Sequence, residues 1–123
     1  SRRSPLRQAW PYSNTGRMTG FSIHPQAITE FDEAFEHYLE IDPELGASFE
    51  KTVFKYIQEI VAAPLRFSIR KPPTRRVNLT PRFGAYYIAY MIWRDKPVIL
   101  AIAHGARRPY YWRKRISESK KLF

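Results

Sequence analysis

The spacing of the apolar residues changes once along this chain, at Pro64. Between residues 25 and 63, apolar side chains recur every three or four positions, as they do on one face of an α-helix. After Pro64 they alternate or form short runs, as they do in strands. Helices grouped before strands favour an α+β fold, in which the helices pack on one face of a mostly antiparallel sheet.

Two helices joined by almost no loop are predicted for the first half. Pro25 suits the first turn of a helix over 25–41, which should end there because the residue before a proline disfavours helical angles. Asp42, Pro43 and an acid in the first turn then begin a second helix over 43–63, and the pair forms a helical hairpin. The acidic residues expected on its outer faces are Glu30, Glu33, Glu36, Glu40 and Glu50.

A four-stranded sheet is predicted from residues 20–24, 75–79, 85–93 and 98–104. The run 85–93 is apolar on both faces, which is expected of a central strand covered on both sides for part of its length. The intervening residues 64–74, rich in proline and arginine, are interpreted as a connection. The predicted core residues are Phe31, Phe35, Phe49, Val53, Ile60, Ile88, Ile99 and Leu100.

The length of 123 residues predicts one domain, with different segments at its two ends. Residues 1–17 show neither period and are interpreted as a disordered leader, an upstream extension or an expression remnant. The domain proper is placed at 18–116, followed by a basic tail at 117–123. The basic residues expected to be solvated, or disordered towards the end, are Arg113, Lys114, Arg115, Lys120 and Lys121.

The charge is distributed very unevenly. Residues 1–63 hold six basic and nine acidic side chains, whereas residues 64–123 hold fifteen basic and two acidic ones, giving the net charge of +10. A half this basic should present a positive face, which attracts nucleic acid, acidic proteins or anionic membrane. The chain has no cysteine and three scattered histidines, so no metal and no cofactor is expected. No stretch approaches the ~20 apolar residues of a membrane helix, so no membrane partner is expected, and the composition fits the cytoplasm.

Three blocks of sequence together resemble the RelE/ParE superfamily of toxins from type II toxin-antitoxin systems. FSIHPQAITEFDEAFEHYLE is similar to the family's opening strand, its His-Pro-x-Ala motif and its amphipathic helix. FGAYYIAYMIW is similar to its aromatic Tyr-Tyr strand. VILAIAHGARRPYYWRKR resembles the closing strand and the His-x-x-Arg-x-Pro-x-Tyr-Trp motif of the ParE-like branch. The resemblance covers about residues 19–115 and implies the α+β fold already predicted from the periodicity.

The resemblance also implies a partner and a divided set of functions. The family's toxins are neutralised by a cognate antitoxin, expected here to bring an acidic segment to the basic half. RelE-like members cleave mRNA on the ribosome, and ParE-like members inhibit DNA gyrase. The first hypothesis is a ParE-like gyrase inhibitor, the second a ribosome-dependent endoribonuclease, and the third a non-toxic nucleic-acid-binding module.

Candidate site residues follow from the chemistry of each hypothesis. A metal-free ribonuclease needs a base, an acid and cations for the phosphorane, and the comparable positions are Arg76, Arg82, His104, Arg107 and Tyr111. The strand FGAYYIAY carries no acid, and no carboxylate is expected beside His104, so a structural role for this histidine is favoured. At least two of Tyr86, Tyr87 and Tyr90 are expected in the core. Arg107 beside Trp112 would suit a protein interface. The residues predicted to bind a target or antitoxin are Arg75, Arg76, Arg82, Arg107, Arg108 and Trp112.

Overall fold

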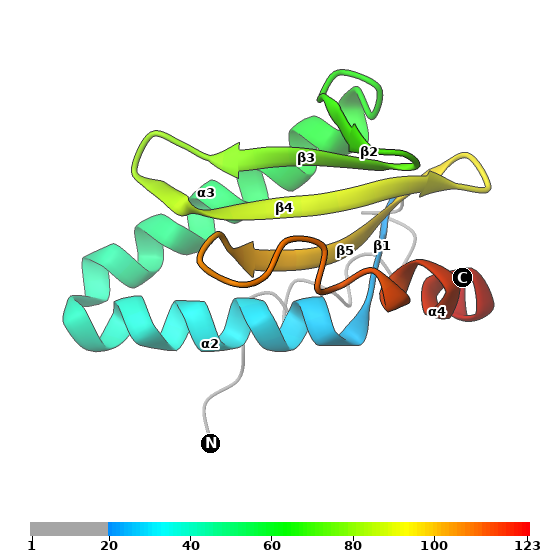
Figure 1. The fold of residues 1–123 in the computed structure, drawn as a ribbon. Helices are drawn as coiled ribbons and strands as arrows, with labels where there is room; N and C mark the ends of the chain where they lie inside the picture. The colour runs from blue at the N-terminus through cyan, green and yellow to red at the C-terminus, as the bar shows by residue number, and fades with distance from the viewer. Residues whose placement is uncertain (1–19) are drawn as a thin grey trace.

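The computed structural model describes residues 20–123, so the prediction for residues 1–17 lies outside the described part of the chain. A five-stranded sheet has the order β1-β5-β4-β3-β2, with β1 parallel to β5 and the other pairs antiparallel. This is the predicted α+β fold with one further strand (Figure 1). In chain order the elements are β1 (Ser22–Ile23), α2 (Pro25–Ile41), α3 (Pro43–Ala62), β2 (Ile69–Lys71), β3 (Thr74–Leu79), β4 (Phe83–Trp93), β5 (Lys96–His104) and α4 (Lys114–Leu122).

Local capping explains where the two hairpin helices begin. The Gln26 N–H donates to Nδ1 of His24 at 3.0 Å, and the Glu44 N–H donates to Oδ1 of Asp42 at 2.9 Å. Asp42 also donates its own N–H to the Tyr38 carbonyl at 3.0 Å, so one residue closes α2 and opens α3. These contacts confirm the predicted helix limits to within one residue.

The hairpin packs closely near this elbow. A Cβ added at Gly46 on α3 would lie 2.9 Å from Cδ1 and 3.1 Å from Cα of Leu39 on α2. Only glycine allows the two backbones to approach this closely without rearrangement.

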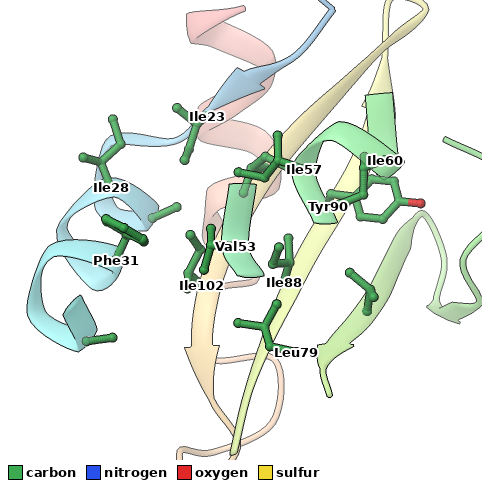
Figure 2. Packing of buried hydrophobic residues seen from close by; sticks show 14 of the residues in the cluster. Ile23, Ile28, Phe31, Val53, Ile57, Ile60, Leu79, Ile88, Tyr90 and Ile102 are labelled. Carbon is green, nitrogen blue, oxygen red and sulfur yellow. The ribbon is translucent and has the colours of Figure 1, made fainter. Parts of the chain in front are cut away.

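The principal core lies between the hairpin and the sheet. Phe31 on α2 stacks on Phe35 and Phe49 with ring centroids 5.9 and 5.7 Å apart. Figure 2 shows side chains of the helices, including Phe31 and Val53, directed towards the sheet. All eight predicted core residues are buried, and seven of them belong to this cluster.

A second apolar cluster covers the opposite face of the sheet. Leu100 belongs to it, together with Tyr87, Met91 and the buried Trp112. The segment after β5 folds back over this face, and Ile116 and Phe123 pack against the cluster (Figure 1). The strands β4 and β5 are therefore buried from both sides, as their continuous apolar runs predict.

The prediction of a solvated basic tail was wrong for part of residues 113–123. Residues Lys114–Leu122 form α4, in which Arg115 is 8% exposed and Ser119 is fully buried. The helix forms because it covers apolar surface of β4 and β5 that would otherwise face water. The side chains that do remain exposed, as predicted, are Arg113, Lys114, Lys120 and Lys121.

The connection predicted at 64–74 contains β2, which makes the sheet five-stranded instead of four-stranded. Ile69 pairs with Arg75, and Lys71 pairs with Thr74. Within residues 20–123, no helix has the length and apolar character needed to span a membrane.

Candidate interaction site

Glu30 on α2 is the centre of a polar cluster beside β5. Its side chain is only 10% exposed. Oε1 accepts the Ile102 N–H at 3.0 Å, and Arg115 donates to both carboxylate oxygens at 2.9 and 3.0 Å. The Tyr111 hydroxyl donates to Oε2, and Nη1 of Arg107 lies 3.5 Å from the same oxygen. These partners neutralise and solvate a carboxylate that burial alone would destabilise.

The prediction that Glu30 lies on the outer face of the hairpin was therefore wrong. Ala27 and Ala34, three positions before and four after it, are buried on the same side of α2. Their small side chains let α2 pack closely against β5, and Glu30 lies where these two elements meet. Acidic residues elsewhere on the hairpin remain exposed, as Glu33 and Glu40 do.

The Glu30–Arg115 pair replaces a missing strand at the edge of β5. β1 pairs with β5 only at Val98 and Ile99. Further along, Glu30 accepts the Ile102 N–H, while Arg115 donates to the Leu100 carbonyl at 3.1 Å. The ion pair thus satisfies backbone groups that an open sheet edge would leave exposed.

A shallow pocket of about 140 Å³ lies next to this cluster. His104, Arg107 and Tyr111, three of the five residues predicted for a ribonuclease site, line it together. Glu30 and Glu33 line it too, so the expectation that no carboxylate lies beside His104 was wrong. Both carboxylates come from α2, which is distant from His104 in sequence and meets it only in the folded structure.

The titratable groups of this pocket are held by internal contacts. Nδ1 of His104 accepts the Ala106 N–H at 3.0 Å, and the His104 ring stands edge-on to Tyr86 at 4.9 Å. Burial raises the pKa of Tyr111 far above the usual tyrosine value, and the hydrogen bond to Glu30 adds to the effect, while the nearby arginines oppose it. Tyr111 is therefore a weak proton donor that is already committed to Glu30.

Arg107 is the most accessible cation of the cluster. Its guanidinium stacks on the Tyr111 ring at 3.7 Å, and its side chain is 56% exposed. Arg108 beside it is exposed as well. Stacking orders the Arg107 side chain, and this reduces the entropy lost when the side chain binds a partner.

The other predicted site residues lie elsewhere. Arg76 stacks on the Tyr87 ring at 3.8 Å on the opposite face of the sheet, at a small pocket that Trp112 also lines. Arg75 donates to the Phe67 carbonyl at 2.7 Å, and Arg82 donates to the Ser48 hydroxyl at 3.2 Å. A single catalytic site built from Arg76, Arg82, His104, Arg107 and Tyr111 is therefore not formed.

Three aromatic residues proved to be structural. Tyr87 and Tyr90 are buried, which confirms that at least two of the three tyrosines belong to the core. Trp112 is only 3% exposed, and its Nε1–H donates to the Tyr87 hydroxyl at 3.1 Å. The prediction of Trp112 as an interface anchor was thus wrong for this structure, because a partner cannot reach a buried indole.

The fold and the site define a small basic α+β domain that presents exposed arginines beside a carboxylate, Glu30, which is bonded to Tyr111 and Arg115. Over residues 21–109 the chain matches the family model described as "ParE toxin of type II toxin-antitoxin system, parDE", and it belongs to that family. It is thus a toxin of a type II toxin-antitoxin system, which implies an antitoxin partner, and the resemblance to the RelE/ParE superfamily is confirmed. No curated protein matches the chain. The matched span includes Glu30. It ends before Tyr111 and Arg115, the two residues that donate hydrogen bonds to the Glu30 carboxylate most closely.

Proposed function

We propose that this toxin inhibits growth by binding DNA gyrase, with Arg107 and Arg108 in the contact surface. The main support is the internal engagement of the acid and base groups around Glu30. The Tyr111 hydroxyl donates a hydrogen bond to Glu30, and Nδ1 of His104 accepts the Ala106 N–H, so the Tyr111 proton and the Nδ1 lone pair are both engaged within the protein. An exposed arginine held by stacking is suited instead to recognition of a protein surface.

One observation favours ribosome-dependent mRNA cleavage as the second candidate. Glu33 lines the same pocket as His104, so a carboxylate and an imidazole are present together. A base and cations at one site are the minimum for attack by a 2′-hydroxyl. The third hypothesis, a non-toxic nucleic-acid-binding module, is superseded by the family membership.

The two candidates separate in one pair of assays with the purified chain. DNA supercoiling by purified gyrase should fall as the toxin is added, while mRNA in a translating extract should remain intact. Ribosome-dependent cleavage without any change in supercoiling would reverse the order of the two functions. Action on gyrase would place the toxin in the cytoplasm.

We further propose that the antitoxin neutralises the toxin with an acidic segment laid against basic residues of the second half of the chain. The charge imbalance supports this, since residues 64–123 carry fifteen basic and two acidic side chains. The exposed acidic residues of α2, which line a separate shallow surface, would repel such a segment and limit it to the other faces.

A further inference from the structure

A groove of about 500 Å³ lies at the opposite edge of the sheet from the Glu30 cluster. Its walls come from the C-terminal half of α3, the connection that precedes β2, and the outer side of β3. None of the residues around Glu30 contributes to it, so it is a separate surface feature.

Part of β3 lies open along this groove. β2 covers only the beginning of β3, and just beyond it the Arg76 N–H donates to the carbonyl of Ser68, the residue before β2, at 3.2 Å. Figure 1 shows β2 beside one end of β3, with the rest of that strand uncovered. Backbone groups of alternate residues point to the same side of an antiparallel strand, so the N–H and C=O of Asn78 point the same way as those of Arg76. Within residues 20–123, no strand lies opposite Asn78 on that side.

The groove is strongly positive. Four basic side chains line it, against one acid, Glu59, which lies 3.5 Å from Arg66. Lys55 and Arg66 lie over the rings of Tyr56 and Phe67 at 5.7 and 5.4 Å, so the cations stand beside apolar surface. The other two basic residues are Arg70 and Arg76.

We infer that this groove binds an extended acidic peptide, which adds a short strand to β3 at Asn78 and places carboxylates against Arg66 and Arg70. Strand addition at an exposed edge takes affinity from the main chain, and side chains then supply specificity. The outward-facing Asn78 carbonyl is free to accept a hydrogen bond from a strand, which a peptide N–H supplies and a phosphate does not. The backbone geometry therefore favours a peptide over a single-stranded nucleic acid, although both would be attracted by the charge. The inference does not depend on gyrase as the target.

The first test uses the purified full chain and a fluorescent peptide of about eight residues, a typical strand length, that alternates glutamate with threonine. Fluorescence anisotropy should show binding that weakens as salt rises. Arg66→Glu combined with Arg70→Glu should weaken binding by about tenfold or more, because two attractive contacts become repulsive. The matched control is Lys114→Glu with Lys121→Glu, which changes the net charge equally on exposed positions of α4 and should leave the affinity nearly unchanged. An equal loss in both variants would show general charge attraction and overturn the inference.

The second test examines the main chain without changing the protein. A peptide with alternate backbone nitrogens methylated in the register that faces β3 lacks the donors that strand addition requires, so its binding should be lost. In ¹⁵N-labelled protein, the unmodified peptide should shift the Asn78 amide signal and slow its hydrogen exchange. Equal binding of the methylated peptide would refute strand addition. Tighter binding of a single-stranded oligonucleotide of equal charge would overturn the choice of ligand in favour of nucleic acid.

Discussion

Glu30 and Arg115 are 85 positions apart in sequence and form a two-pronged ion pair at the edge of β5. The pair attaches α4 to α2, and it also occupies the backbone groups of Leu100 and Ile102. His24 adds a second link between the same helices, because its Nε2 lies 2.8 Å from Glu118. With Nδ1 accepting the Gln26 N–H, the ring proton lies on Nε2 and is donated to Glu118.

Replacing Glu30 with glutamine should destabilise the protein strongly. The change leaves the buried Arg115 guanidinium without an anion, and breaking a buried pair from one side costs about 3–5 kcal/mol. Chemical denaturation measures the loss of free energy of unfolding. Glu33→Gln is the matched control, since Glu33 is an exposed glutamate on the same helix and should lose less than about 0.5 kcal/mol. Similar losses in the two variants would contradict the role of Glu30.

Replacing Phe49 with alanine tests the principal core. Phe49 is fully buried and stacks on Phe31, so the deletion should cost about 3–5 kcal/mol. Ile41→Ala removes an apolar side chain that is 61% exposed, and its effect should be small. A loss under about 1 kcal/mol at Phe49 would show that the packing of the hairpin is wrongly assigned.

Because the pKa of Tyr111 is raised in the folded protein, the free energy of unfolding should depend on pH in the alkaline range. A group whose folded-state pKa exceeds its unfolded value contributes stability below the unfolded pKa, near ~10 for tyrosine, and this contribution is lost as pH rises towards the folded value. The wild-type protein should therefore lose stability more steeply above about pH 10 than Tyr111→Phe, which lacks the titrating hydroxyl. Equilibrium unfolding at a series of pH values gives both slopes. Parallel slopes for the two proteins would exclude a coupling between Tyr111 ionisation and folding.

Substitutions of Arg107 and His104 should distinguish a toxin that acts by binding gyrase from one that acts by cleaving mRNA. Under the proposed function, His104→Gln should leave inhibition of supercoiling nearly unchanged, because no proton transfer is involved. Arg107→Ala with Arg108→Ala should lower potency by about tenfold or more, since both side chains are exposed and belong to the proposed contact surface. Circular dichroism checks that each variant is folded. If His104→Gln instead lowers mRNA cleavage by about 10²–10⁴-fold, general acid–base catalysis would be indicated.

The association of toxin with antitoxin should depend on salt. An acidic segment attracted to the basic half gains encounter rate from long-range electrostatics, which salt screens within a Debye length of ~10 Å at 0.1 M. Stopped-flow mixing should show an association rate that falls as salt rises, with a smaller change in the dissociation rate. An association rate that is constant from low to high salt would rule out electrostatic steering.

The hairpin and the central strands were predictable because each rests on local signals. Pro25 at the first helix, the cap residue Asp42 and the helical period between them are visible in the sequence, as is the double-sided apolar run of β4. The cap that His24 supplies was found only in the structure. β2 and α4 gave no such signal. β2 has three exposed residues, too few to show a period, and in α4 the buried residues are Arg115 and Ser119, which hydropathy cannot identify.

The candidate site was predictable only in part, for a related reason. His104, Arg107 and Tyr111 lie within eight positions of one another, so their meeting follows from local sequence. Glu30 joins them only through tertiary structure. In the sequence it is one of several glutamates on the same predicted helix, and nothing in its residue type separates it from the exposed ones. The single available signal is its position between the small residues Ala27 and Ala34, where a neighbouring segment can approach the helix.

Because Asp42 caps both α2 and α3, the connection between the two helices contains no residue that could be moved or removed without changing a cap. An insertion after Asp42 would separate its two capping roles and move Gly46 out of register with Leu39, so that a bulkier residue would meet the Leu39 backbone. Insertions in this protein should therefore be concentrated elsewhere, in exposed turns where added residues extend into solvent.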